Sequence, residues 1–264
     1  MSDRPILSVR DARVGFNTAR GTVRAVDGVS FDLGAGSTLG IVGESGSGKS
    51  VLVRSLIGLV STTTGVEVEG QVLFEGGDIR KLAPAEFRGL LGRDIGIVFQ
   101  DPMTSLNPVM KIGRQIGEGL RLNRGFDRSA ADRRSVELLA EVGIPEPERR
   151  AGQYPHEMSG GMRQRVAIAI AIACAPKLLI ADEPTTALDV TVQRQILDLL
   201  QREQRQRGMS MILITHDLGV AASRADDIMV MYAGRAVETA PTREIFRTPR
   251  MPYTEALLRS LPRL

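Results

Sequence analysis

The 264-residue chain contains a single cysteine, Cys174, which excludes an intrachain disulfide and a cysteine-based metal cluster within it. Long hydrophobic runs are also missing. The longest, residues 166–175, has ten residues, whereas a helix that spans a bilayer needs about 20. Residues 1–4 lack the apolar core of a secretory signal peptide. These absences predict a soluble protein that stays inside the cell.

A large excess of charge of one sign is missing as well, because 34 basic residues stand against 31 acidic ones and the net charge is only +3. Arg202, Arg205 and Arg207 form a local basic cluster, but acidic residues interrupt it and no aromatic residue accompanies it. Nucleic-acid surfaces combine dense positive charge with stacking aromatics. We therefore interpret the cluster as a solvated helix face and expect no nucleic-acid partner.

Short β-rich runs alternate with longer helical patterns, which is typical of a sheet covered by helices. Strands are expected at residues 6–10, 29–33, 38–42, 72–74, 95–100, 178–182, 211–215 and 228–232. Helices are expected at residues 49–59, 112–122, 130–142, 161–173, 190–207 and 218–225. Residues 166–175 alternate like a strand, but their alanine content favours a helix. The fold class is therefore α/β, a sheet covered by helices.

The chain is expected to form one domain over residues 1–264. From about residue 105 to residue 159 the pattern is helical, which indicates a helical subdomain inserted into the α/β body. Residues 1–104 and 160–245 are expected to form the core, with an N-terminal β subdomain. Residues 246–264 are expected to form a C-terminal helical tail.

Eight residues match the phosphate-loop pattern G-x-x-x-x-G-K-[ST]: Gly43, Glu44, Ser45, Gly46, Ser47, Gly48, Lys49 and Ser50. They follow the apolar run 39–42 and precede a helical pattern, which is the context that this loop requires. The glycines allow successive backbone N–H groups to turn toward phosphate oxygens, and the helix N-terminus adds positive potential. Lys49 would reach the β and γ phosphates, and the Ser50 hydroxyl would hold Mg²⁺. The loop therefore predicts a nucleoside triphosphate site.

The strand expected at 178–182 begins with four apolar residues and ends in Asp182, and a second acidic residue, Glu183, follows it. In phosphate-loop enzymes an aspartate at a strand end orients the magnesium shell. The adjacent Glu183 would then face the γ-phosphate and act on the attacking water. Without the phosphate loop upstream this pattern would be weak, since many strands end in polar turns.

Two further polar residues stand at the ends of expected strands. His216 follows the run 211–215, at the carboxyl end of a strand where ligands of such sheets bind. It is a candidate γ-phosphate sensor, although a lone histidine there is more often a surface residue or a cap. Gln100 closes the run 95–100, and its amide could reach Mg²⁺ or the lytic water.

Ser159, Gly160, Gly161 and Met162 open the alanine-rich helix and would expose N–H groups and a hydroxyl at its N-terminus. This would be a second anion-binding surface, 111 residues beyond Gly48, and one monomer hardly needs two. An ordinary helix cap by Ser159 is the alternative.

In order and spacing, these motifs resemble the ATP-binding cassette ATPases. More narrowly, four stretches resemble the ATP-binding subunits of dipeptide and oligopeptide importers, a group shared with nickel importers. They are VFQDPMTSLNP at 98–108, YPHEMSGGMRQR at 154–165, IADEPTTALDV at 180–190 and ITHDLG at 214–219. The likeness covers nearly the whole chain.

The resemblance implies a mixed sheet core flanked by helices, with an antiparallel β edge. It also implies a cassette dimer in which each ATP lies between the phosphate loop of one subunit and Ser159 to Met162 of the other. It also assigns roles to single residues. Glu183, His216 and Gln100 are implied as catalytic, and Ser50, Gln100 and Asp182 as the residues that hold Mg²⁺. Asp189 would communicate across the dimer, and Phe16 is the candidate for stacking on adenine.

The function implied by the resemblance is ATP hydrolysis that energises import of dipeptides or oligopeptides through an inner-membrane transporter. The expected partners are a second cassette, identical or paralogous, two transmembrane permease subunits and, indirectly, an extracytoplasmic solute-binding protein. A groove around residues 101–108 would receive a cytoplasmic helix of the permease. The expected location is the cytoplasmic face of the inner membrane, as a peripheral subunit.

Four alternatives stay open. The chain could serve an importer of nickel or of another small solute, or it could be a soluble cassette ATPase acting on nucleic acid, which the low net charge opposes. A regulatory subunit without turnover is opposed by the presence of both Glu183 and His216. An exporter subunit shares the fold, but the four stretches quoted above favour import.

Overall fold

The computed structural model describes residues 4–60, 64–101, 105–186 and 188–260. Two compact units make up the chain. Unit 1 comprises Met1–Ala83 and Ser210–Leu264, and unit 2 comprises Pro84–Met209. The chain therefore leaves unit 1 once, builds unit 2 and returns.

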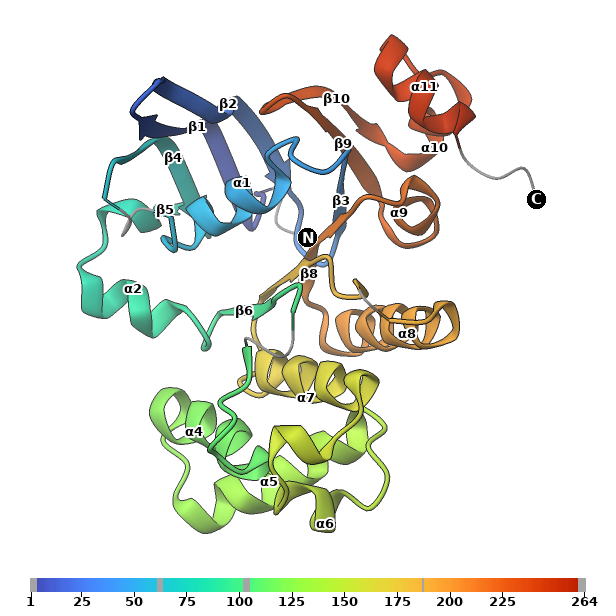
Figure 1. Ribbon diagram of the computed structural model, residues 1–264. Coiled ribbons are helices and arrows are strands. Elements are labelled where there is room, and N and C mark those ends of the chain that lie inside the picture. Colours follow the sequence, from blue (N-terminus) through green and yellow to red (C-terminus); the bar gives the residue numbers. More distant parts are fainter. Residues whose placement is uncertain (1–3, 61–63, 102–104, 187, 261–264) are drawn as a thin grey trace. The chain divides into compact units, whose positions relative to one another are not determined.

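An antiparallel sheet with the strand order β2-β1-β4-β5 forms one part of unit 1 (Figure 1). Its strands are β1 (Leu7–Thr18), β2 (Gly21–Leu33), β4 (Val66–Phe74) and β5 (Gly77–Asp78). β1 and β2 extend well beyond the strands expected at 6–10 and 29–33. The additional length ends in an exposed tip, where Thr18 pairs with Gly21 and Val23 is 56% exposed, but it also includes the buried Ala12, Val14 and Val26. These buried residues are separated by polar or glycine residues and form no continuous apolar run, and the expectation was therefore too short.

The second part of unit 1 is a set of strands in the order β10-β9-β3-β8. These are β3 (Thr38–Val42), β8 (Ser210–Thr215), β9 (Asp227–Tyr232) and β10 (Arg235–Pro241). β3 runs parallel to both of its neighbours, whereas β10 is antiparallel to β9, so the sheet is mixed, as predicted. Every residue of β3 and β8 is buried, which explains their continuous apolar sequences.

The helices of unit 1 are short. They are α1 (Lys49–Leu56), the 3-10 turn η1 (Ile79–Lys81), α9 (Leu218–Arg224), α10 (Thr242–Arg247) and α11 (Pro252–Arg259). α9 packs against β3, where Gly40 leaves only enough room for Ala221 and Ala225. β10 was not expected, because its sequence RAVETAP has no apolar run.

Unit 2 is mainly helical and holds two parallel strands, β6 (Ile95–Val98) and β7 (Leu178–Asp182). Its helices are α2 (Pro84–Leu90), α4 (Ile112–Arg124), α5 (Arg128–Glu141), α6 (Pro147–Ala151), α7 (Gly160–Ile172) and α8 (Val190–Arg207), with a 3-10 turn η2 (Pro155–Glu157). α7 lies against α4, α5 and α8 (Figure 1). The strand expected to reach Gln100 ends two residues earlier, at Val98, and Gln100 lies in the turn that follows.

The prediction that the alanine-rich segment is a helix is confirmed. α7 covers residues 160–172 and has buried residues on several of its faces. α8 has the bounds that the sequence predicted. Asp189 caps its N-terminus by accepting a hydrogen bond from the Val192 N–H at 2.9 Å, and Gly208 ends it in the left-handed conformation. None of the helices that the structure describes is both long and apolar enough to cross a bilayer.

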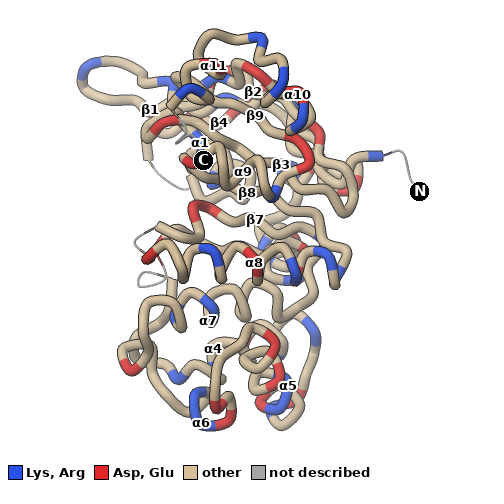
Figure 2. The backbone as a smooth tube through the Cα atoms, turned by 90° about the vertical axis from the view of Figure 1, so that its right-hand side faces the viewer, with Lys and Arg blue, Asp and Glu red and all other residues tan. Residues whose placement is uncertain are grey.

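Residues of opposite charge lie close together along α5 and α8 (Figure 2). Arg207 pairs with the buried Glu203 at 3.1 Å and with Glu141 at 2.5 Å, and Arg202 lies 3.2 Å from Glu203. Arg205 is exposed. The basic cluster of α8 is therefore partly an ion-pair network within unit 2, rather than the fully solvated helix face that the sequence suggested.

Candidate functional site

The phosphate loop of unit 1 connects β3 to α1 and folds around the side chain of Lys49. The ammonium Nζ donates hydrogen bonds to the backbone oxygens of Gly43 and Glu44, each at 2.8 Å, and lies 3.5 Å from Ser47 Oγ. Only 4% of Lys49 is exposed. Ser50 follows in the first turn of α1 and is half-buried. The lysine therefore lies inside the loop, where an anion held by the loop would meet it.

Two glycines of this loop are required by space as well as by conformation. Gly43 has φ +155°, and a Cβ added there would lie 2.2 Å from the Met231 backbone oxygen. Gly48 has φ +101°, and its Cβ would lie 2.3 Å from the Ala25 backbone oxygen. Side chains at these positions would collide with fixed backbone atoms. The pattern of glycines in the sequence thus reflects the close approach of neighbouring strands and turns.

His216 lies in the turn between β8 and α9 and is exposed. The turn is held by Asp217, whose Oδ1 accepts hydrogen bonds from the Gly219 and Val220 N–H groups at 2.7 and 3.1 Å. A cavity of about 190 Å³ within unit 1 is lined by both Gly43 and His216. The structure therefore brings the start of the phosphate loop and the predicted sensor histidine to one cavity.

Glu183 in unit 2 receives hydrogen bonds from two side chains on the same oxygen. Gln100 Nε2 lies 3.3 Å and Thr186 Oγ1 lies 3.1 Å from Glu183 Oε2. The backbone of Glu183 has φ +45°, a left-handed conformation that is uncommon for residues other than glycine and costs of order 1 kcal/mol. The side chain is half-buried. The carboxylate that the sequence singled out is therefore both oriented and held on a strained backbone.

Asp182 ends β7 and is 1% exposed. Among the described residues, no group of three His, Cys, Asp or Glu side chains could hold a metal by themselves. The predicted magnesium donors are of a different kind, namely the Ser50 hydroxyl, the Gln100 amide oxygen and the Asp182 carboxylate. Mg²⁺ prefers hard oxygen donors and is usually bound by few protein groups together with substrate phosphates and water. The chemistry of these donors therefore fits magnesium held with a nucleotide.

Ser159 is the N-cap of α7, and its Oγ accepts a hydrogen bond from the Met162 N–H at 3.3 Å. Ser159 and Gly160 are exposed. Gly161 lies against α8, because a Cβ there would be 2.9 Å from Val192 Cγ1. This contact brings the start of α7 and the start of α8, which Asp189 caps, together within unit 2. Ser159 and Asp189 both act as helix caps, which is the ordinary role that the sequence left open for Ser159.

Phe16 lies in the antiparallel sheet of unit 1, where β1 pairs it with Val23 of β2 and Val66 of β4. It is half-buried. Pro102, Met103, Thr104 and Ala187, which belong to the motifs quoted from the sequence, lie outside the described residues.

Sequence reasoning did not single out several residues that contact the predicted site residues. Among them are Thr186, which donates to Glu183, Gly234, whose N–H donates to the Ser47 backbone oxygen at 3.0 Å, and Tyr253, whose Oη accepts from the Glu44 N–H at 3.2 Å. Thr186 could have been found, because a hydroxyl three residues after a carboxylate is within reach in a turn. Gly234 is 187 positions from Ser47, and Tyr253 is 209 positions from Glu44. No local sequence pattern points to either residue.

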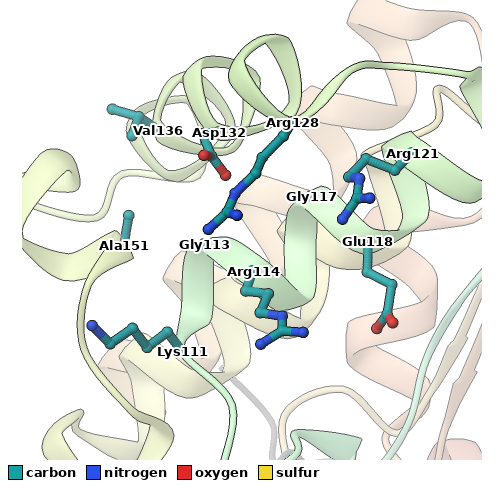
Figure 3. Close-up of a pocket in the computed structure, with 10 residues that line it drawn as sticks. All are labelled: Lys111, Gly113, Arg114, Gly117, Glu118, Arg121, Arg128, Asp132, Val136 and Ala151. Carbon is teal, nitrogen blue, oxygen red and sulfur yellow. The ribbon is translucent and has the colours of Figure 1, made fainter.

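A second cavity is unrelated to these motifs. It measures about 490 Å³ and lies between α4, α5 and the end of α6 in unit 2 (Figure 3). Its lining includes Lys111, Arg114, Arg121 and Arg128, and no predicted site residue.

Comparison with known proteins shows which family this chain resembles. Residues 26–186, more than half of the chain, match the family described as ABC transporter, and residues 237–264 match the family described as the C-terminal region of oligopeptide/dipeptide transporters. Bacillus subtilis strain 168 has two similar proteins. The oligopeptide transport ATP-binding protein OppD is 54% identical over 98% of this chain and 72% of OppD, and the dipeptide transport ATP-binding protein DppD is 51% identical over 98% of this chain and 77% of DppD.

A solved structure has the same fold. The dimeric ATP-binding cassette MJ0796, in a post-hydrolysis state bound to ADP and Pi, gives a TM-score of 0.79 at 28% identity and covers 90% of this chain and 99% of that chain. The cassette fold expected from the sequence is confirmed by this match. Together with the family match over residues 26–186, it shows that the chain belongs to the ABC transporter family.

Proposed function

We propose that this chain hydrolyses ATP to energise the import of oligopeptides or dipeptides through a membrane transporter. The observation that carries the proposal is the similarity, over nearly the whole chain, to proteins named for ATP binding in oligopeptide and dipeptide transport. The phosphate loop with its enclosed Lys49 and the oriented Glu183 supply the chemistry that such a subunit needs.

The phosphate loop holds the triphosphate in this proposal. Its backbone N–H groups and the N-terminus of α1 face the anion, and Lys49 exchanges its two backbone carbonyl partners for phosphate oxygens. Ser50, Gln100 and Asp182 hold Mg²⁺, which neutralises charge on the transferred phosphoryl group. Phe16 stacks on the adenine ring.

Glu183 acts on the attacking water. A carboxylate oxygen already held by Gln100 and Thr186 needs little reorganisation when the substrate arrives. Glu183 accepts the proton of the water as that water attacks the γ-phosphorus, while the bond from this phosphorus to the β–γ bridging oxygen breaks and ADP leaves. His216 contacts the γ-phosphate. A general base of this kind contributes typically 10² to 10⁴-fold to a rate.

Two copies of the cassette, or this chain and a paralogue, close on the nucleotides. Ser159, Gly160, Gly161 and Met162 serve the nucleotide of the opposite subunit, with Asp189 beside them at the start of α8. ATP then binds the closed state better than the open one and shifts the population toward it, and hydrolysis removes that preference. This use of ATP explains why one chain carries two anion-binding motifs.

The membrane partners are two permease subunits, which an extracytoplasmic solute-binding protein supplies with peptide. We place the subunit at the cytoplasmic face of the inner membrane, as a peripheral component. The segment from residue 105 to residue 159 forms the helical subdomain, and the surface around 101–108 receives a cytoplasmic helix of the permease. When the cassettes close on ATP, this contact transmits their movement to the membrane subunits.

The variant Glu183→Gln tests the proposal. It removes the base but keeps the shape of the side chain, so turnover should fall by at least about 100-fold while ATP still binds. Size-exclusion chromatography with ATP and Mg²⁺ should then show a stabilised dimer. Glu148→Gln, at an exposed position of α6, is the matched control and should keep wild-type turnover. Turnover in Glu183→Gln equal to that of the wild type would reject the assignment.

A further inference from the structure

Tyr253 of α11 contacts the first turn of the phosphate loop, 209 residues away in the sequence. Its Oη accepts a hydrogen bond from the Glu44 N–H at 3.2 Å. The ring of Tyr253 lies against the ring of Tyr232 at the end of β9, with 4.6 Å between their centroids. A tyrosine hydroxyl is ordinarily neutral at physiological pH, and burial raises the pKa of the Tyr253 hydroxyl further. A neutral phenol oxygen thus holds one backbone amide of the loop.

The end of β9 and the turn that follows it approach the same loop at two further points. The Gly234 N–H donates to the Ser47 backbone oxygen at 3.0 Å. The Met231 backbone oxygen lies so close to Gly43 that a Cβ on this glycine would be 2.2 Å from it. Three points of the loop, at residues 43, 44 and 47, are therefore in contact with the C-terminal part of unit 1.

α11 is firmly attached to unit 1. The buried carboxylate of Glu238 in β10 accepts hydrogen bonds from the Arg250 and Met251 N–H groups, at 2.8 and 3.2 Å, just before the helix begins. Tyr253, Leu257 and Leu258 pack against a buried apolar cluster. That cluster includes Val42, the residue immediately before the loop. Because α11 is fixed to the same core as the loop, Tyr253 can hold the Glu44 amide in place.

We propose that Tyr253 is a positioning residue for nucleotide binding. Through Tyr253, α11 keeps the first turn of the phosphate loop in the conformation that binds an anion. This inference rests on the proposed function, in which the loop binds ATP. A loop ordered before the ligand arrives loses less conformational freedom on binding than a loop that the ligand must order. Removal of one such hydrogen bond should weaken nucleotide binding by about 2- to 12-fold.

The variant Tyr253→Phe isolates the hydroxyl, because it keeps the ring and its contact with Tyr232. Tyr232→Phe is the matched control, since the hydroxyl of Tyr232 makes no hydrogen bond to any residue that the structure describes. Calorimetry with the non-hydrolysable analogue AMP-PNP should give a Kd raised by about 3- to 10-fold in Tyr253→Phe and unchanged within 2-fold in Tyr232→Phe. In steady-state ATPase assays, KM should rise with little change in kcat.

Hydrogen–deuterium exchange without nucleotide gives a second readout on the full-length chain. A peptide that contains residues 43–50 should exchange faster in Tyr253→Phe than in the wild type and the control. Unchanged exchange and unchanged Kd in Tyr253→Phe would overturn the proposal. Tighter binding would overturn it as well, because the hydroxyl would then compete with phosphate for the Glu44 N–H. If the folded wild type does not bind AMP-PNP at all, the proposed function fails, whereas the exchange experiment still decides whether Tyr253 orders the loop.

Discussion

Gln100 and Glu183 lie 83 residues apart in the sequence and meet in unit 2, where Gln100 Nε2 is 3.3 Å from Glu183 Oε2. Thr186 donates to the same oxygen. Gln100 lies in a turn after β6, and Glu183 follows β7, its parallel neighbour, so the pairing of these two strands sets the distance between the side chains. The predicted base is thus oriented by the residue that is also expected to hold magnesium.

The first prediction concerns this orientation. Gln100→Ala removes both the donor to Glu183 and an oxygen proposed for Mg²⁺. Groups that orient a catalytic or metal-binding side chain typically contribute 10- to 100-fold, so kcat should fall by about that factor. Phosphate release should be measured over a range of Mg²⁺ concentrations, and the variant should need more Mg²⁺ than the wild type.

Gln206→Ala, at an exposed position of α8, is the control for this prediction and should behave like the wild type. A Gln100→Ala variant with normal kcat and a normal Mg²⁺ requirement would remove Gln100 from the site.

The sequence predicted the parts of the fold that follow local rules. β3 and β8 are continuous apolar runs, and α8 has an aspartate cap and a terminal glycine, so their positions could be read directly. The outer part of the β1–β2 hairpin and the strand β10 could not, because neither contains a continuous apolar run, and the pairing of their backbones with neighbouring strands is a tertiary feature.

Some features of the candidate site can likewise be identified from the sequence, and others cannot. The phosphate loop, Asp182 and Glu183 stand in patterns whose residue types have a chemical reason, and the sequence therefore identifies them. The left-handed backbone of Glu183 and the contact between Tyr253 and Glu44 are tertiary features. No spacing rule encodes a hydrogen bond between residues 209 positions apart.

The second prediction concerns Lys49. Each hydrogen bond to a charged group contributes about 1.5–3 kcal/mol, and Lys49 is expected to exchange its carbonyl partners for two phosphate groups. Lys49→Ala should therefore weaken ATP binding by at least about 100-fold, which calorimetry would measure. Lys81→Ala is the control, because Lys81 is exposed and lies 3.7 Å from Asp78 in a weak surface pair. ATP affinity in Lys49→Ala close to that of the control would contradict the role of this lysine.

The third prediction compares two glycines of unit 1. Gly48→Ala places a Cβ 2.3 Å from the Ala25 backbone oxygen at φ +101°, whereas Gly36→Ala meets no atom within 4 Å at φ +72°. The left-handed conformation alone costs about 1–2 kcal/mol for alanine, and the clash adds to this cost at Gly48. Urea denaturation should show a clearly larger loss of stability in Gly48→Ala than in Gly36→Ala. Equal losses would show that the backbone around Gly48 moves freely to admit a side chain.

The fourth prediction concerns the single thiol. Burial raises the pKa of Cys174, which is 3% exposed after the end of α7, although the neighbouring Arg124 opposes this shift. The Sγ lies 3.4 Å from the Gly119 backbone oxygen, to which the thiol donates. The thiolate is the reactive form, so the folded chain should react far more slowly with iodoacetamide at pH 8 than the chain in guanidinium.

The sign of the pH dependence follows from the same shift. Because the pKa is higher in the folded chain, the protonated thiol favours folding below the unfolded pKa, and this contribution is lost as the pH rises through the folded value. Labelling of the native protein should therefore rise only at a pH above that at which the unfolded chain reacts. Mass spectrometry of samples quenched at each pH would measure both curves. Rapid, complete labelling of the native chain at pH 8 would mean that the packing of Gly119 and Arg124 around Cys174 opens readily in solution.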